Sequence, residues 1–166
     1  LFQESLFFEL EEKKLTDYEG INEWRKIFRE TGKDPNRYRH SAEALYRRVK
    51  KQQYIQPVNS AIDLNNFFSL QYGLPIGVYD SNKLKGDITI RIGRDGEQYE
   101  GLNGRSNSLH NLIVSTDEAG PFGSPFVDSE RSMVTEATEA ALHIVYLRPS
   151  MSIDENKKLS ESLMAM

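Results

Sequence analysis

The chain has 166 residues, of which 38% are hydrophobic and 28% charged, and its formal net charge is −4. This length favours one domain that buries a sizeable core without cross-links, and the absence of cysteine excludes disulfides and thiolate chemistry. No apolar run reaches the ~18 residues of a membrane span and no signal peptide is visible, so we expect a cytoplasmic protein with no membrane association.

The first half of the chain predicts mainly helices. A strand is predicted at residues 5–10. GINEWRKIFRETG has apolar residues at helical spacing and predicts a helix that Gly32 ends. YRHSAEALYRRVKK predicts a second helix. A third is predicted to begin at Pro57 and to continue to about Tyr72, before Gly73.

The second half predicts mainly strands. Isoleucines alternate with other residues over 88–92, and the RDGEQY turn should return the chain as a hairpin partner over 97–101. LHNLIVST predicts another strand, and the Gly/Pro-rich residues 119–126 predict a loop. The apolar run 141–147 predicts a buried strand. SIDENKKLSESLMAM predicts a closing helix. We therefore expect an α+β fold in which N-terminal helices pack on a mainly antiparallel or mixed β-sheet, in a single domain over 1–166.

Positive charge is concentrated between Arg25 and Tyr54, a segment that contains ten basic and three acidic residues. This segment has a formal charge of +7, and the rest of the chain −11. Either it forms a face that binds a polyanion, or it consists of solvated helix faces. Because Arg47 and Arg48 are adjacent on a helix, only one of them should face outward. The candidate nucleic-acid contacts are Arg39, Arg47, Arg48, Lys50 and Lys51.

Three polar residues recur on one face of the predicted third helix. Asn59, Asp63 and Asn66 fall within about 60° of one another, and the rest of the circumference is mostly apolar, which predicts a buried helix. An unpaired buried polar group costs about 1–3 kcal/mol, so this stripe needs partners. Either it pairs with backbone groups of the loop after Gly73, or part of it lines a ligand pocket.

Metal and cofactor sites are not predicted. The three histidines are scattered, and no His, Cys or Asp cluster has the spacing of a metal site. His143, beside the apolar run, is expected to be a hydrogen-bonded structural residue. Asp80 is expected to cap the turn at Ser81 and Asn82.

Three segments, in order, resemble the tRNA-editing domain of the phenylalanyl-tRNA synthetase beta subunit. VNSAIDLNNFFSLQYGLPIGVYD is similar to the family pattern V-D-V/I-T-N-Y-V-M-L-E-x-G-Q-P-x-H-x-F-D, AGPFG to A-G-V-M-G, and VTEATEAALHIVYL to V-x-x-x-T-x-x-x-L-L-E-x-A-x-F. The similarity covers about residues 20–148. RYRHSAEALYRRV and LPIG resemble a freestanding branch of small proteins that consist largely of this domain.

The resemblance implies binding of tRNA or aminoacyl-tRNA, and hydrolysis of a misattached aromatic amino acid by a held water. Asn66 and Gly123 match pocket positions of the family. The family's histidine aligns with Gly77, its arginine falls near Gln56, and its glutamate falls near Ile144. Those three functional groups are therefore missing here. Since the glutamate meets the hydroxyl of tyrosine, its loss changes the expected choice of substrate.

An insertion relative to the synthetase pattern, SPFVDSERSMVT, offers substitutes in Arg131 and Ser132, and Thr138 matches a family threonine. No catalytic residue is singled out. Two alternative functions remain: a non-catalytic RNA-binding module with a degenerate pocket, and a protein that binds a small ligand such as an amino acid. The candidate pocket residues are Asn59, Asp63, Asn66, Gly77, Gly123, Arg131, Ser132 and Thr138.

Overall fold

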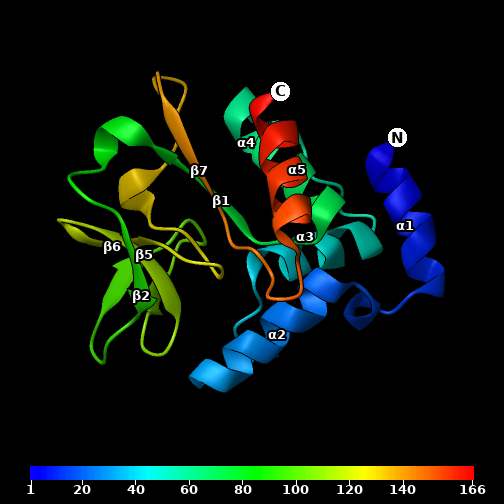
Figure 1. Cartoon of the computed structure of the whole chain (residues 1–166), viewed down its shortest axis with the longest axis horizontal. Helices are drawn as coiled ribbons and strands as arrows, with labels where there is room; N and C mark the ends of the chain where they lie inside the picture. The colour runs from blue at the N-terminus through cyan, green and yellow to red at the C-terminus, as the bar shows by residue number, and fades with distance from the viewer.

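A two-stranded antiparallel ladder joins the helices of this protein to its small sheets. The computed structural model describes residues 1–166, and β1 (Ile76–Asp80) and β7 (Ala141–Val145) run through its centre (Figure 1). Ile76 pairs with Val145 at one end and Asp80 with Ala141 at the other. Most of the helices lie on one side of this ladder, and the remaining strands lie on the other (Figure 1).

The helical side is built from segments that the sequence pattern largely predicts. Gly32 and Gly73 end the second and fourth helices in the left-handed conformation, with φ of 102° and 64°. The fourth helix begins three residues later than expected, because Asn59 rather than Pro57 caps it. The helices are α1 (Phe2–Glu12), α2 (Glu19–Thr31), α3 (Ser41–Lys50), α4 (Ser60–Tyr72) and α5 (Ile153–Met164). None of them is long and apolar enough to cross a membrane.

The strands pair only in antiparallel fashion, which confirms the predicted α+β class. One sheet has the order β2 (Thr89–Ile92), β5 (Ile113–Asp117), β6 (Gly120–Gly123), and a separate hairpin joins β3 (Gln98–Glu100) to β4 (Ser106–Ser108). Short 3-10 turns complete the chain: η1 (Leu15–Asp17), η2 (Ser81–Lys83) and η3 (Glu130–Ser132).

The strand predicted at residues 5–10 is wrong, because this segment lies within α1. Leu6 and Leu10 are four residues apart, and both are buried in a cluster that includes Val49 of α3. An (i, i+4) apolar pair of this kind needs a helix to face one partner. Glu9 and Lys13 form an ion pair at the same spacing on the outer face.

Two predictions about the strands are also wrong. The strand at 88–92 does not pair with residues 97–101: its partner is β5, which supplies the buried Val114, whereas β3 pairs with β4. Residues 120–123 are not loop but strand β6, whose backbone pairs with β5. The strand at 141–147 ends at Val145 and is mostly half-buried.

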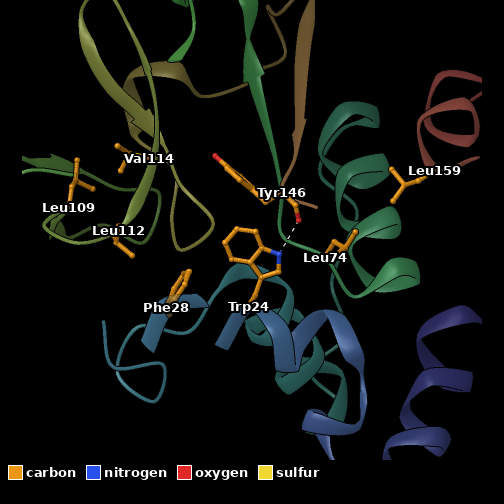
Figure 2. Packing of buried hydrophobic residues seen from close by; sticks show 8 residues of the cluster. All are labelled: Trp24, Phe28, Leu74, Leu109, Leu112, Val114, Tyr146 and Leu159. Atoms are coloured by element: carbon orange, nitrogen blue, oxygen red, sulfur yellow. Dashed lines mark hydrogen bonds between the residues drawn. The ribbon is translucent and has the colours of Figure 1, made fainter. Parts of the chain in front are cut away.

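Trp24 connects the α2 helix to the end of β7. Its indole nitrogen donates a hydrogen bond to the carbonyl oxygen of Tyr146 at 3.1 Å (Figure 2). The side chain belongs to a cluster that draws residues from both the helices and the strands, so this core fixes the two sides relative to each other. The buried members are Trp24, Phe28, Leu74, Leu109, Leu112, Val114, Tyr146 and Leu159 (Figure 2).

We predict that Trp24→Phe lowers the free energy of unfolding by about 1–3 kcal/mol, because it removes both packing volume and the hydrogen bond to Tyr146. Urea unfolding followed by circular dichroism measures this loss. Phe8→Leu, at a side chain that is 63% exposed, serves as the control and should change stability by less than about 0.5 kcal/mol. Equal effects of the two substitutions would contradict the role given to Trp24.

Candidate functional site

A cavity of about 420 Å³ lies between α3, α4, β1 and the loop after β6. Most of its wall is apolar, with a few polar side chains among the apolar ones, as in typical small-molecule sites. Its polar lining residues are Ser41, Arg48, Asn65, Asn66, Ser124 and Asp128. Its apolar lining residues are Ala44, Leu45, Ile62, Ile76, Val78, Leu102, Phe126, Val127, Met133 and Val134.

Next to this cavity the side chain of Tyr79 is buried between two glycines. A Cβ atom at Gly77 would lie 2.0 Å from the phenol oxygen of Tyr79, and one at Gly123 would lie 2.2 Å from it. The ring also packs edge-on against Phe122, with 4.8 Å between ring centroids. Gly77 and Gly123 are therefore covered by the protein's own tyrosine and do not border open space.

The phenol of Tyr79 donates a hydrogen bond to Asp128, which lines the cavity. The Tyr79 oxygen lies 2.7 Å from Asp128 Oδ1, and the backbone nitrogen of Ser124 donates to the same oxygen at 3.3 Å. Asp128 Oδ2 receives no hydrogen bond from the protein, and it is not among the buried atoms that lack a partner. Oδ2 is therefore not fully buried, and the residue that carries it lines the cavity. Burial raises the pKa of Asp128 to about 7, and the bonds from Tyr79 and Ser124 partly offset this rise.

The loop that carries Asp128 is held by its own hydrogen bonds. The hydroxyl oxygen of Ser124 accepts from the backbone nitrogens of Phe126 and Val127, both at 3.1 Å, and donates to the carbonyl oxygen of Val127 at 2.9 Å. The Tyr99 hydroxyl donates to the same carbonyl. The position of Asp128 is thus fixed from several directions.

Neighbouring asparagines on α4 have different roles. Asn65 is buried: its Nδ2 donates to the Ile76 carbonyl oxygen at 2.8 Å, and its Oδ1 accepts from His143 Nδ1 at 3.3 Å. Ser69 donates to the Leu74 carbonyl oxygen at 2.6 Å. The pairing with the loop after Gly73 therefore exists, but it uses residues outside the predicted stripe. His143 is hydrogen-bonded as expected, and burial lowers its pKa.

Asn66 is half-buried and lines the cavity, and none of the hydrogen bonds formed by side chains within the protein involves its amide. The rest of the stripe lies elsewhere. Asn59 accepts from the backbone nitrogen of Ile62 at 3.0 Å, and Asp63 accepts from that of Val58 at 2.8 Å. The α4 helix is not buried all round as predicted, since its fully buried residues are Asn65, Phe68, Ser69 and Leu70.

Three other predicted pocket residues do not line this cavity and make contacts elsewhere. Arg131 forms a two-point ion pair with Asp117, at 2.9 and 3.2 Å. Ser132 is fully buried and donates to the Phe122 carbonyl oxygen at 3.2 Å. Thr138 donates to Asp80 Oδ2 at 2.9 Å. Two smaller hollows hold further members of the set: one of about 310 Å³ includes Asp63 and Asn66, and one of about 260 Å³ includes Asn59 and Thr138.

Asp80 caps its turn as predicted, since its Oδ1 accepts from the backbone nitrogen of Asn82 at 3.0 Å. No group of three or more His, Asp or Glu side chains lies close enough together to hold a metal ion.

The basic segment divides into internal and outward-facing residues. Arg47 pairs with the buried Glu43 at 3.0 Å, and Arg25 pairs with the same carboxylate at 2.8 Å. Arg48 is exposed and lines the cavity, so the two adjacent arginines have different partners, although the Arg47 side chain is itself 36% exposed. The other predicted contacts, Arg39, Lys50 and Lys51, are exposed as well.

Asp128, Tyr79 and Asn65 were not predicted as site residues from the sequence. Two weak signals were present. Asp128 follows two apolar residues within the insertion SPFVDSERSMVT, and Tyr79 stands where the pattern P-x-H-x-F-D has phenylalanine. Only the fold brings these two residues together, since they are 49 positions apart.

Comparison with known proteins finds that the family profile of the B3/4 domain matches residues 23–162. The uncharacterized protein YhzB of Bacillus subtilis is 29% identical over 166 residues, which cover 100% of this chain and 73% of that protein. The phenylalanine–tRNA ligase beta subunit of Paramagnetospirillum magneticum is 37% identical over 108 residues, which are 63% of this chain and 14% of the subunit. The same subunit of Bartonella quintana is 31% identical over 90 residues, which are 53% of this chain and 11% of that subunit.

We predict opposite outcomes for the two neighbouring asparagines. Asn65→Ala should lower the free energy of unfolding by about 1–3 kcal/mol, because it leaves the Ile76 carbonyl without its partner. Asn66→Ala should change stability by less than about 0.5 kcal/mol, because it removes no hydrogen bond. Thermal and urea unfolding of both variants test this difference. A larger loss for Asn66→Ala than for Asn65→Ala would reverse the assignment.

We also predict that Asp128 makes stability pH-dependent. An unfolded aspartate titrates near ~3.9, whereas Asp128 in the folded protein titrates at about 7. Between these pH values the folded state keeps a proton that the unfolded chain has released. The contribution of Asp128 to stability is therefore fully present below about pH 4, falls as pH rises to about 7, and is constant above that.

Asp128→Asn cannot ionise, so its stability relative to the wild-type protein should increase from pH 4 to pH 7 and then stay level. Urea unfolding of both proteins at a series of pH values measures this difference. Asp87→Asn, at an exposed aspartate, is the matched control and should show a constant difference across the range. A constant difference for Asp128→Asn as well would show that this carboxyl is not perturbed.

Proposed function

This chain belongs to the B3/4 domain family, and we propose that it binds the aminoacylated 3′ end of a tRNA and hydrolyses the ester of a misattached amino acid. Two kinds of observation support the proposal: the names of the relatives, and the cavity with its lining residues. Relatives named phenylalanine–tRNA ligase beta subunits place related sequences in enzymes that attach an amino acid to tRNA. This chain spans only 14% and 11% of those subunits, so the proposal concerns this domain and not the ligase reaction.

The observation that carries the proposal is an apolar cavity with an exposed arginine on its wall. Its volume of about 420 Å³ falls within the range of about 300–1,000 Å³ that is usual for small-molecule sites. The apolar side chains of the wall suit an apolar or aromatic amino-acid side chain. The accessible groups of Asn66 and Asp128 suit the polar end of the same ligand, where an ester and an amino group lie together.

Arg48 gives this cavity a connection to the tRNA backbone. Arg48 lies on α3 where the helix borders the cavity, and the nearby Lys50 and Lys51 are also exposed. Phosphate contacts by such residues position a nucleic acid without reading its sequence. The terminal phosphates would therefore be held at the cavity while the amino acid enters it. The Asn66 amide is suited to donate a hydrogen bond to the carbonyl oxygen as negative charge develops there.

A second function is favoured by one observation on the ladder. Gly77 and Ile144, which align with the family's histidine and glutamate, lie directly opposite each other in the β1–β7 pairing. Neither side chain carries a functional group, and neither residue lines the cavity, so these two positions supply no catalytic chemistry. A binding module for RNA, without hydrolysis, is therefore the second candidate.

The two candidates are separated by one panel of aminoacyl-tRNAs. The panel includes Tyr-tRNA, Phe-tRNA and tRNAs mischarged with aliphatic amino acids, and both deacylation and binding are measured at two salt concentrations. Hydrolysis above the uncatalysed rate for a subset of the panel is the result expected of a deacylase. Salt-sensitive binding without hydrolysis would favour the RNA-binding module. Binding of free amino acids with no affinity for tRNA would overturn both.

We predict that Arg48→Ala weakens tRNA binding. The plot of log binding constant against log salt concentration should become less steep by about one unit, because one phosphate contact is lost. The loss should be similar for all members of the panel, because the contact is to phosphate. Filter binding or fluorescence anisotropy at several salt concentrations measures it. Lys157→Ala, at an exposed lysine on α5, removes the same charge away from the cavity and should leave the slope unchanged.

A further inference from the structure

We propose that Asp128 is the catalytic base of the cavity, and that its Oδ2 atom takes a proton from the water that attacks the ester. This inference rests on the proposed function and names the residue that performs its chemical step. It assigns a role to a residue in the loop after β6, and not to Gly77 or Ile144, the positions that align with the family's histidine and glutamate.

Asp128 is the one lining residue of the cavity that can gain and lose a proton near neutral pH. The other polar lining residues are an arginine, serines and asparagines, and none of them is a carboxylate or an imidazole. The other candidate bases near α4 do not line this cavity. Asp63 accepts a backbone hydrogen bond at 2.8 Å and borders the hollow of about 310 Å³, and His143 contacts Asn65.

The two oxygens of Asp128 have separate tasks. Oδ1 accepts from the Tyr79 hydroxyl and from the backbone nitrogen of Ser124, which fixes the orientation of the carboxylate. Oδ2 has no protein partner and is accessible, so a water can donate to it. A base must lie within hydrogen-bond reach of the proton it removes, and an oriented carboxylate with one free oxygen at a cavity wall meets this condition.

The surroundings of Asp128 also favour proton transfer. Burial raises its pKa to about 7, so the carboxylate at neutral pH is a stronger base than an exposed aspartate. The donors at Oδ1 keep this rise moderate, and a fraction of the protein is therefore ionised under ordinary conditions. Tyr79 itself stays protonated, because burial and the nearby carboxylate raise its pKa well above the usual value.

The step balances with water as the second reactant. Asp128 accepts one proton from water as the water oxygen forms a bond to the ester carbonyl carbon. The resulting tetrahedral species breaks its bond to the ribose oxygen, and protonated Asp128 returns the proton to that oxygen. The products are a free amino acid and a tRNA with an intact 3′ hydroxyl, and Asp128 is a carboxylate again.

Two features of this chain that depart from the synthetase pattern meet at this pair. Tyr79 replaces the phenylalanine of P-x-H-x-F-D, and the added hydroxyl is the group that bonds Asp128. Asp128 itself comes from the inserted segment. Each departure needs the other: the tyrosine hydroxyl would be buried without a partner if Asp128 were absent, and the carboxylate would lose its orienting donor if residue 79 were phenylalanine.

The test measures kcat/KM for deacylation by the full chain as a function of pH, on the most reactive member of the aminoacyl-tRNA panel. The variants are Asp128→Asn, Tyr79→Phe and the exposed control Asp87→Asn. Asparagine can still accept the Tyr79 hydrogen bond, so Asp128→Asn should fold, and circular dichroism verifies this. The uncatalysed rate is subtracted at each pH.

We expect Asp128→Asn to lower kcat/KM by about 10²- to 10⁴-fold with little change in tRNA affinity, and to remove the fall in rate below about pH 7. Tyr79→Phe should keep activity but move this fall to higher pH, because the hydrogen bond that stabilises the carboxylate is lost. A merely structural role would not shift the profile. Asp87→Asn should match the wild-type protein.

The outcomes separate this inference from the proposal on which it rests. If the wild-type chain hydrolyses part of the panel and Asp128→Asn remains within about threefold of it, Asp128 is not the base and the proposed function stands. If the wild-type chain hydrolyses no member, the deacylase function fails and the catalytic role of Asp128 fails with it. An unshifted profile for an active Tyr79→Phe overturns the part given to Tyr79.

Discussion

The buried phenol of Tyr79 is the constraint on which the site depends. Its oxygen lies so close to Gly77 and Gly123 that a side chain at either position would collide with it. The two glycines come from different antiparallel pairs, β1–β7 and β5–β6, so one aromatic ring fixes the distance between the central ladder and the small sheet. The same ring directs its hydroxyl at Asp128, and the loop that carries this aspartate is thereby placed against the cavity. Both glycines, which the sequence placed among the candidate pocket residues, are instead required by an internal side chain.

Helix geometry assigns neighbouring residues of the same type to different tasks. Successive side chains on a helix point about 100° apart, so one can brace the fold while the next faces a cavity. On α4, Asn65 fixes the backbone that enters β1, while the Asn66 amide has no protein partner. On α3, Arg47 neutralises the buried Glu43, while Arg48 is exposed. In both pairs the bracing residue keeps a buried polar group satisfied, and this frees its neighbour from any structural duty.

The sequence predicts the elements that depend on local pattern, and it fails where distant residues decide. Apolar spacing and terminal glycines are enough for α2, α3, α4 and α5. The error at α1 came from a short apolar run whose period is ambiguous until Leu6 and Leu10 meet the α3 helix. The pairing of β2 with β5 depends on which strand can fill the core, and no turn motif encodes that choice. For the site, the sequence included Asn66 and Arg48 among its candidates, and helical phase, which is local, predicted that Arg47 and Arg48 face different ways. It missed the Tyr79–Asp128 pair, because neither segment alone identifies a hydrogen-bond partner 49 positions away.

The distribution of polar groups around the cavity also bears on what it can bind. The ladder wall contributes apolar residues such as Ile76 and Val78, so a ligand side chain in contact with it gains from burial but finds no hydrogen-bonding partner there. The single carboxylate and the free amide come from other elements, and Arg48 supplies the positive charge at the same cavity. A ligand complementary to this lining combines an apolar group, polar groups that meet Asp128 and Asn66, and an anion. An aminoacyl ester at the end of an RNA chain combines these three parts, whereas a free amino acid lacks the phosphate that Arg48 would contact.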